Sequence, residues 1–171
     1  MKKIKIALGH KAQVGKDTFL ECVQDIIPDV INIKIANGVY NGATAIQKEY
    51  GIKPHKDRKL LQFIGNHFRK EKGEDFWIKQ TLLQISSLQD KHLINTDCRY
   101  QNEFNYLKDI GFTMIKINRP GVALTGEAGD HPSENDLNNE SRWDYVLEND
   151  GTTEKYYKDI ATLINKLINK D

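Results

Sequence analysis

The chain has 171 residues, which suits a single domain with a sizeable core. Hydrophobic residues make up 39% and charged residues 29%, a composition typical of globular proteins that excludes a disordered chain. The net charge of +1 provides no overall attraction to nucleic acid or to an anionic membrane, so a bound anion would need a local cluster of cations.

Cysteine usage and the lengths of the apolar runs bear on the cellular compartment. Cys22 and Cys98 lie far apart without the spacing of a metal site, so we interpret both as buried, reduced thiols. The amino-terminal MKKIKIALGH has too short an apolar run for a signal peptide, and no stretch approaches the ~20 apolar residues of a membrane span. We therefore expect a cytoplasmic protein.

Hydrophobic periodicity predicts strands that alternate with helices along the chain. Short apolar runs predict strands at 4–8, 31–36, 92–97, 112–118 and 144–149. Apolar residues at helical spacing predict helices from Lys16 to Pro28 and at 39–51, 57–73, 74–90, 102–111 and 153–169. Residues 119–142 are rich in Gly, Asn, Ser and acids, which predicts a long loop that is functional or mobile. The alternation predicts an α/β fold: a parallel sheet with right-handed crossovers and helices on both faces.

Three polar positions follow predicted strands directly. Gly9, Asp97 and Arg119 each come after a strand, and the carboxyl ends of parallel strands meet at one edge of a sheet. We expect these positions to line one ligand-binding crevice.

The stretch GHKAQVGKDT at 9–18 is similar to a phosphate-binding loop. Such a loop needs glycines for its sharp turns, inward-facing N–H groups, a lysine and a following helix whose amino end attracts anions. The usual spacing is G-x-x-x-x-G-K-[ST], and Gly15-Lys16 fits it. The competing interpretation is an ordinary strand-to-helix turn with a surface lysine. The candidate ATP phosphate ligands are Gly9, Lys11, Gln13, Val14, Gly15, Lys16, Asp17 and Thr18.

The loop departs from the usual pattern in two places. Gly9 is one residue too early, so the extension HKAQV adds bulk that could bring Lys11 or His10 near the ligand. Asp17 stands where a Ser or Thr normally binds Mg²⁺. Asp17 could bind the metal directly or through water, or Thr18 could take over, and the sequence leaves these alternatives open.

Together with this loop, further blocks make the chain resemble the deoxynucleoside monophosphate kinases, a P-loop kinase family common in bacteriophages. The blocks occur in order and cover nearly the whole chain: GKDT at 15–18, KDRKLLQFIG at 56–65 followed by Arg69 and EDFW at 74–77, INTDCRYQNE at 94–103, RPG at 119–121, HPSE at 131–134 and NDG at 149–151. The departures are the longer first loop and Ile35-Ala36-Asn37, where an aromatic residue is expected before the alanine.

The resemblance implies a three-layer α/β/α P-loop NTPase fold with a mainly parallel sheet of about five strands. It implies a single kinase domain with a helical acceptor-binding region at 38–90 and a lid at 119–142. The implied activity transfers the γ-phosphoryl group of ATP, with Mg²⁺, to a nucleoside or deoxynucleoside monophosphate. The protein would act in the host cytoplasm if phage-encoded, without nucleic-acid or membrane partners. The family suggests a homodimer, although the residues leave the oligomeric state open.

The resemblance also implies roles for single residues. Lys16, Arg99 and Arg119 would be catalytic, and Asp17, Thr18 and Asp97 would hold Mg²⁺ directly or through water. Asp97 could instead, or as well, cap the following helix. The residues implied for the acceptor are Arg58, Gln62, Arg69, Trp77 and Arg99, and those implied for the lid are Arg119, His131 and Glu134.

Several of these residues have ordinary structural alternatives. Arg58 could be a solvated surface charge, and Trp77 could pack in the core rather than stack on a base. Ser133 and Glu134, followed by Leu137, could form a helix cap. His131 is expected to order the lid rather than transfer protons, and Trp143 is expected in the core.

Two other functions share the same sequence features. A kinase of a non-nucleotide small molecule, similar to phosphomevalonate or dephospho-coenzyme A kinases, would use the same loop and crevice. A nucleotide-binding protein without phosphotransfer would bind ATP but show no acceptor-dependent release of ADP. The block from Arg58 to Trp77 favours a nucleotide acceptor.

Overall fold

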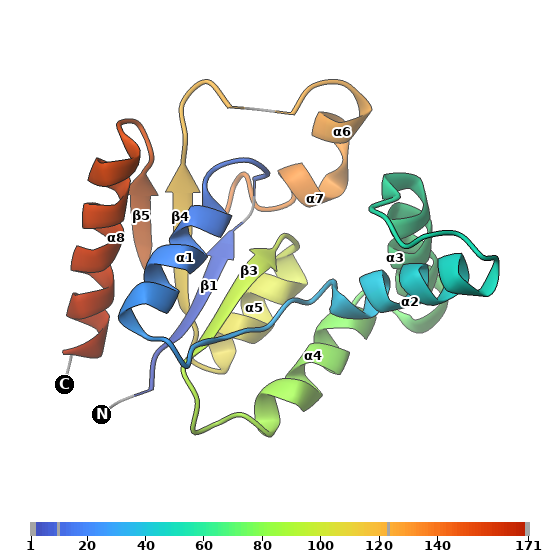
Figure 1. Ribbon diagram of the computed structural model, residues 1–171, viewed down its shortest axis with the longest axis horizontal. Helices are drawn as coiled ribbons and strands as arrows, with labels where there is room; N and C mark the ends of the chain where they lie inside the picture. Colours follow the sequence, from blue (N-terminus) through green and yellow to red (C-terminus); the bar gives the residue numbers. More distant parts are fainter. Residues whose placement is uncertain (1–2, 10, 123, 170–171) are drawn as a thin grey trace. The chain divides into compact units, whose positions relative to one another are not determined.

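The structure is a computed structural model that describes residues 3–9, 11–122 and 124–169 (Figure 1). The chain forms two compact units, each described here by itself. The first, which we call the sheet unit, comprises Met1–Ile33 and Gln89–Asp171. The second, which we call the inserted unit, comprises Lys34–Leu88.

A five-stranded sheet forms the centre of the sheet unit. Its strands are β1 (Lys5–Gly9), β2 (Ile31–Asn32), β3 (Leu93–Cys98), β4 (Thr113–Asn118) and β5 (Tyr145–Glu148). They lie in the order β2-β3-β1-β4-β5, and every pair is parallel. This arrangement confirms the predicted parallel sheet. It also places β1, which leads into the loop, in the middle of the sheet.

The predicted strand at 31–36 is too long. The ladder with β3 covers only Ile31 and Asn32, with one further bond from the N–H of Ile33 to the carbonyl of Ile94. The chain then turns, because the N–H of Asn37 donates to the carbonyl of Lys34. Ile33 and Ile35, which suggested a longer strand, are buried although they lie beyond the end of the ladder.

Helices cover both faces of the sheet. α1 (Lys16–Ile26) and α8 (Thr153–Ile168) lie together on one face, and α5 (Gln101–Asp109) lies on the other (Figure 1). The main core lies between the sheet and the helices α1 and α8, and its fully buried residues include Ile6, Leu8, Phe19, Ile94, Ile115 and Ile160. The sheet unit is therefore a three-layer α/β/α structure. None of the helices in the described part of the chain is long and apolar enough to cross a membrane.

Trp143 fixes the carboxyl end of β1. Its ring packs edge-on against Phe104 of α5, with the centroids 4.9 Å apart. A Cβ atom at Gly9 would overlap this ring, so only glycine fits where β1 enters the loop. The expectation that Trp143 serves packing agrees with these contacts.

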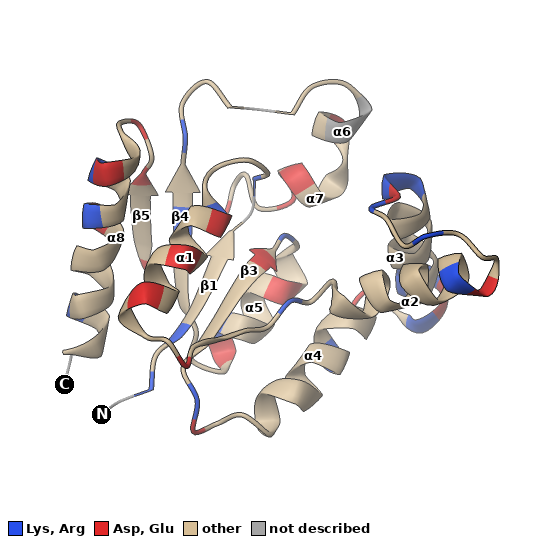
Figure 2. Cartoon of the chain, viewed as in Figure 1, with Lys and Arg blue, Asp and Glu red and all other residues tan. Residues whose placement is uncertain are grey.

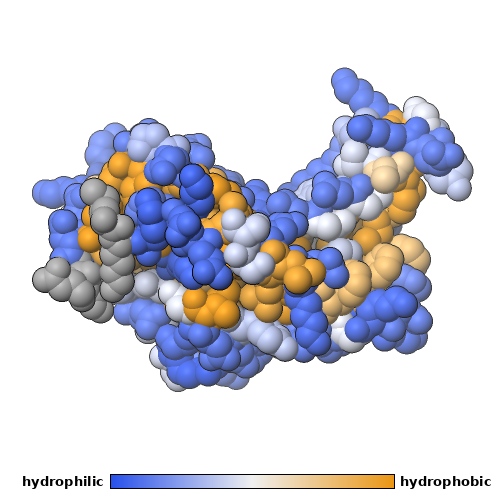
Figure 3. Space-filling model, turned by 90° about the horizontal axis from the view of Figure 1, so that it is seen from below, coloured by the Kyte–Doolittle hydropathy of each residue, from blue (hydrophilic) through white to orange (hydrophobic). Residues whose placement is uncertain are grey.

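The inserted unit contains three helices, α2 (Asn37–Glu49), α3 (Arg58–Lys72) and α4 (Phe76–Ser86). Asp57 caps α3 by accepting a hydrogen bond from the N–H of Leu60. The predicted helix at 74–90 begins later and ends earlier, at Ser86. Apolar residues appear on the surface of this unit in the space-filling view (Figure 3). Its exposed large apolar and aromatic side chains are Tyr40, Ile46, Tyr50, Ile52, Phe63 and Leu83.

The segment 119–142 between β4 and β5 contains two short helices, α6 (Glu127–Asp130) and α7 (Pro132–Asn135). His131 caps α7, since its Nδ1 accepts from the N–H of Ser133 at 3.2 Å. The predicted alternative of a cap formed by Ser133 and Glu134 is therefore wrong, because the cap residue is His131, two positions before Ser133. Leu137 is fully buried, which anchors the segment after α7.

Candidate active site

The loop between β1 and α1 has the backbone of an anion-binding turn. Gln13 and Gly15 both adopt left-handed conformations, with φ of 61° and 104°. Such residues let successive N–H groups point to one side of the chain. A side chain at Gly15 would press on Asn149 and Tyr156, so the second glycine of the motif is required by both backbone and packing.

The carbonyl groups of the loop are held from outside by side chains. Arg119 donates to the carbonyl of Gln13 at 3.1 Å, Asn149 to that of Val14 at 2.9 Å and Tyr156 to that of Gly15 at 3.3 Å. Lys16 donates to the carbonyl of Lys11. Side chains thus take up these loop carbonyls next to the positive amino end of α1, which attracts anions. His10 lies outside the described residues.

Lys16 is the first residue of α1 and lies in a strongly charged environment. Burial, followed by the positive charge of Arg99, lowers the pKa of Lys16 from 10.5 to about 8. The carboxylates of Glu134, Asp97 and Asp17 act in the opposite direction. Residues from β3, α1 and the 119–142 segment thus gather around one buried ammonium group, which an additional anion would stabilise.

Asp97 lies near the end of β3 and its carboxylate accepts from the side chain of Asn95 at 2.8 Å. The interpretation of Asp97 as a helix cap is wrong, because the cap position of α5 is Tyr100. The buried carboxylate of Glu103 accepts from the N–H groups of Arg99 and Tyr100, at 2.9 and 3.2 Å. Asp97 is therefore not the cap of α5 and stays a candidate residue of the site.

Arg99 follows β3 and is paired with Glu134 of α7. Arg99 NH1 lies 2.6 Å from Oε1 of Glu134, and the other oxygen, Oε2, accepts from the N–H of Ala12 at 2.8 Å. The side chain of Glu134 is only 6% exposed, whereas that of Arg99 is 33% exposed. One carboxylate therefore joins the loop to the arginine.

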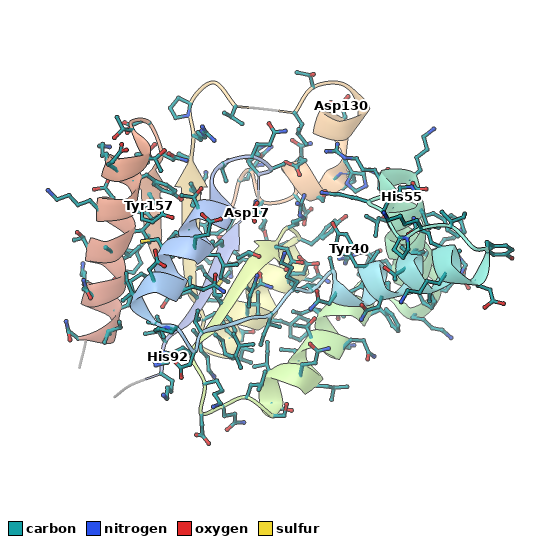
Figure 4. The ribbon with its side chains drawn as sticks, viewed as in Figure 1. Asp17, Tyr40, His55, His92, Asp130 and Tyr157 are labelled. Atoms are coloured by element: carbon teal, nitrogen blue, oxygen red, sulfur yellow. The ribbon has the colours of Figure 1, made fainter. Side chains whose placement is uncertain are left out.

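Hard oxygen donors for a Mg²⁺ ion lie near Lys16. Asp17 lies at the amino end of α1 (Figure 4), followed by Thr18, and Asp97 approaches from β3. The described part of the chain contains no group of three or more His, Cys, Asp or Glu side chains that could enclose a metal. Mg²⁺ is commonly held by one or two carboxylates, water and substrate phosphates. The residues present fit that mode of binding.

The acceptor residues implied by the sequence are all on the inserted unit except Arg99. Arg58, Gln62 and Arg69 lie on one side of the uninterrupted helix α3, since offsets of four and eleven residues return to the same face. Arg58 and Gln62 are exposed, and Arg69 donates to the carbonyl of Glu74 at 2.8 Å. These side chains share a surface that a polar ligand could reach.

Trp77 is a packing residue, in agreement with the structural alternative. It is 6% exposed, its Nε1 donates to the carbonyl of Gly65 at 3.0 Å, and its ring contacts Phe68 and Phe76. It also borders a cavity of about 230 Å³ inside this unit. Side-chain amides and the two rings line this cavity: Asn37, Asn41, Phe76, Trp77, Gln80 and Gln84.

A larger cavity, of about 510 Å³, lies at the opposite end of the sheet from the loop. Lys5, Thr113 and Tyr145, the first residues of β1, β4 and β5, line it. Ligands of parallel sheets bind at the carboxyl ends of the strands, so we do not assign the phosphate site to this cavity despite its size.

The sequence matches the family described as deoxynucleotide monophosphate kinase over residues 17–160. The chain belongs to this family. It is 37% identical over 125 residues, 63% of its length, to the "Putative deoxynucleotide monophosphate kinase" of Acanthamoeba polyphaga mimivirus, and covers 61% of that protein. It is also 37% identical over 87 residues, 47% of its length, to an uncharacterized protein of Ictalurid herpesvirus 1 (strain Auburn), of which it covers 35%. The chain thus spans less than two thirds of the length of these relatives.

Solved structures show that the kinase fold is shared well beyond the family. Shikimate kinase from Aquifex aeolicus is similar with a TM-score of 0.52 and 16% identity, over 98% of this chain and 100% of that one. Dephospho-CoA kinase from Campylobacter jejuni is similar with a TM-score of 0.56 and 15% identity, over 96% and 97%. At these identities the likeness establishes the P-loop kinase fold, which confirms the predicted fold class.

Sequence reasoning missed several residues that build this candidate site. Asn149 and Tyr156 hold the loop carbonyls, and Glu103 orients the backbone at Arg99. Asn149 and Glu103 lie in the family-like blocks, which was the available signal. The backbone N–H of Ala12 had none, because a side-chain motif does not report on backbone contacts.

Proposed function

We propose that the protein is a deoxynucleoside monophosphate kinase that transfers the γ-phosphoryl group of ATP to a (deoxy)nucleoside monophosphate. The observation that carries this proposal is the buried ammonium group of Lys16 at the tip of α1, with Arg99, Asp17 and Asp97 around it. A buried cation at a helix amino end is suited to a polyphosphate. Membership of the deoxynucleotide monophosphate kinase family supports this choice of reaction.

In this proposal the loop binds the donor. Its amide groups and Lys16 hold the β- and γ-phosphates, and the phosphate charge compensates the burial that lowers the Lys16 pKa. Gly9, Lys11, Gln13, Val14 and Gly15 shape the loop. The outer contacts from Arg119, Asn149 and Tyr156 keep the loop in its binding conformation before the nucleotide arrives.

Asp17, Thr18 and Asp97 would hold Mg²⁺, directly or through water. The ion would neutralise charge on the phosphate oxygens of ATP. Asn95 supports Asp97 by donating to its carboxylate, which restricts the directions that the carboxylate can face.

The inserted unit binds the acceptor through Arg58, Gln62 and Arg69, and Arg99 binds the acceptor phosphate. Lys and Arg are concentrated on α3 and the segment before it (Figure 2). Residues 52–73 contain seven Lys and Arg against two acidic residues, although the whole chain has a net charge of +1. This is the local cationic cluster that a near-neutral protein needs to capture an anion.

The reaction is then a direct phosphoryl transfer. An oxygen of the acceptor phosphate forms a bond to the γ-phosphorus, the bond from this phosphorus to the β-γ bridging oxygen breaks, and ADP leaves. Both reactants are anions, so the arginines and Lys16 act mainly by positioning them and neutralising their charge. Segment 119–142, with Arg119, His131 and Glu134, serves as the lid that excludes water.

A coupled assay of ADP release with every common ribo- and deoxyribonucleoside monophosphate tests the proposal. We expect at least one nucleotide acceptor to raise ADP release far above the ATP-only rate. Shikimate, dephospho-coenzyme A and phosphomevalonate, none of which is a nucleoside monophosphate, serve as alternative acceptors in the same screen. A response to one of these alone would assign another kinase activity, and Mg-dependent ATP binding without any acceptor response would indicate a non-catalytic protein.

A further inference from the structure

Glu134 makes the most direct connection between the two sides of the site within the sheet unit. Oε1 lies 2.6 Å from NH1 of Arg99, and Oε2 accepts from the N–H of Ala12 at 2.8 Å. The carboxylate is almost completely buried, so both contacts are made away from bulk water. Charge-assisted hydrogen bonds of this length are strong and directional.

We propose that Glu134 is a positioning residue that fixes the guanidinium of Arg99 and the tip of the phosphate loop relative to each other. This inference rests on the proposed function and deepens it. Arg99 faces the acceptor phosphate, whereas Ala12 belongs to the loop that holds the donor. A carboxylate that binds both sets the separation of the two phosphates that must react.

Glu134 can perform this role because it is itself held in place. His131 caps the short helix that carries it, Leu137 is fully buried behind it, and Asp136 accepts from the N–H of Gln101 at 2.6 Å. These contacts tie α7 to the start of α5. Within the segment proposed as the lid, α7 is therefore the part that is anchored to the sheet unit.

Arg99 is also held at its backbone, by the carboxylate of Glu103. Glu134 takes up NH1 and leaves the guanidinium other N–H donors for a phosphate. The side chain of Arg99 is one-third exposed, so a ligand can reach it. The contact therefore orients the arginine without using its full binding capacity.

The charges around Lys16 explain why the residue that joins Arg99 to the loop, Glu134, is a carboxylate. Arg99 and Lys16 are both cations that face phosphates, and Arg99 lowers the pKa of Lys16, whereas Glu134 raises it. A negative charge between them offsets their repulsion before the nucleotides bind. A neutral amide would hold the geometry less well and would leave the repulsion in place.

An alternative role for the same contacts would be a substitute phosphate. In that case the carboxylate would occupy the place of a nucleotide phosphate and leave when ATP binds. The two roles predict opposite results when the charge is removed. Loss of a positioning residue lowers kcat, whereas loss of a competitor tightens ATP binding.

The test compares Glu134→Gln with the matched control Glu140→Gln. Glu140 belongs to the same segment, is equally buried at 4% exposure and is paired with Arg142 at 2.6 Å, but its contacts are with Gln101 and Arg142. The first readout is hydrogen exchange of the Ala12 amide by NMR in the ligand-free protein. We expect exchange to accelerate at least ~10-fold in Glu134→Gln and to stay unchanged in Glu140→Gln.

The second readout is kinetic. We expect kcat to fall about 10- to 100-fold in Glu134→Gln, with the ATP dissociation constant changed less than about threefold. Glu134→Asp should recover part of the loss. Arg99→Lys should cost much less in the Glu134→Gln background than in the wild type, because the arginine is no longer oriented there.

Each contrary result has a clear meaning. Tighter ATP binding in Glu134→Gln would establish the substitute-phosphate role, and unchanged kcat or full additivity with Arg99→Lys would also overturn the proposal. If the wild type phosphorylates no nucleotide, the proposed function fails. The exchange of the Ala12 amide and the ATP affinity would then still decide whether Glu134 clamps the loop.

Discussion

The phosphate loop of the sheet unit and the outer side of α3 in the inserted unit are built in contrasting ways. The loop is held by side chains from several elements, which bind its carbonyls and the amide of Ala12. On α3, Arg58 and Gln62 are exposed, and a Cβ at Gly65 would have no atom within 4 Å. Contacts within the protein therefore hold the loop in place, whereas these side chains on the outer side of α3 are exposed to solvent.

The two regions should differ in the conformational entropy that they lose when a ligand binds. A preorganised loop loses little conformational entropy when a phosphate binds, so its donors act at full strength. If α3 binds the acceptor as proposed, the ligand must immobilise its long side chains, which costs affinity. Changes in the loop should therefore affect the reaction itself, whereas changes on α3 should mainly affect acceptor binding.

The largest effect is expected for Lys16→Ala. Removing the buried ammonium group should lower kcat by about 10³-fold, because the charge proposed to hold the β- and γ-phosphates is lost. The fold should be unaffected or slightly more stable, since burial of this cation is unfavourable in the absence of phosphate. Steady-state kinetics and thermal unfolding, with the exposed Lys158→Ala as control, measure both. Retention of most of the activity would remove Lys16 from the mechanism.

Arg58→Ala and Arg69→Ala should each raise the acceptor KM by about 10- to 100-fold, the worth of a charge-assisted hydrogen bond. The KM for ATP should stay within about twofold, because the donor loop is built without these residues. Lys70→Ala on the same helix makes the same change of charge on another face and should have little effect. Equal effects of all three variants would indicate general electrostatic attraction rather than a defined acceptor surface.

The pKa of Lys16 predicts a pH dependence of ATP binding. The ligand-free protein has a pKa of about 8 at this residue, and bound phosphate holds the proton. ATP affinity should therefore be constant below pH 7 and fall roughly fivefold between pH 8 and pH 9. Calorimetry at several pH values measures this decline. Lys16→Arg, whose guanidinium stays charged, should abolish the decline, and an unchanged slope in that variant would assign it to another group.

The sequence predicted the type and order of the secondary-structure elements better than their ends. The order of strands and helices followed from apolar periodicity, and the loop followed from Gly15 and Lys16 next to a strand. The ends of elements were less predictable: the second strand stops at Asn32 because the chain turns at Lys34, which the run of isoleucines hides. Local pattern determines the element, and tertiary contacts determine where it ends.

Residue types predicted the charged groups of the site better than their contacts. Lys16, Arg99, Asp17 and Asp97 could be chosen from motifs because each motif is local in sequence. The contact of Glu134 with Ala12 joins residues 122 positions apart, and no local pattern encodes it. This contact exists only in the folded chain, where α7 lies next to the loop.

The smallest effects are expected when single glycines are replaced by alanine. These variants distinguish a glycine that leaves space for a ligand from one that the fold requires. Gly65 lies in the interior of α3 on the side that carries Arg58 and Arg69, within about 60° of both around the helix axis. Gly42 lies in the interior of α2, where an added Cβ would make an ordinary contact with Ile64 at 3.8 Å. Replacing either glycine with alanine should stabilise its helix by about 0.5–1 kcal/mol, as measured by urea unfolding.

Only Gly65→Ala should also raise the acceptor KM, by a few-fold, because its methyl group projects into the space that the acceptor needs beside the arginines. Gly42→Ala should leave the KM unchanged. The loop glycine Gly9 gives the opposite result in stability: Gly9→Ala should lower it by about 1–3 kcal/mol, because the new Cβ overlaps the ring of Trp143. Gly65 would then be kept for the ligand and Gly9 for the fold. If Gly65→Ala stabilises the helix without changing the acceptor KM, the open side of α3 is not the acceptor surface.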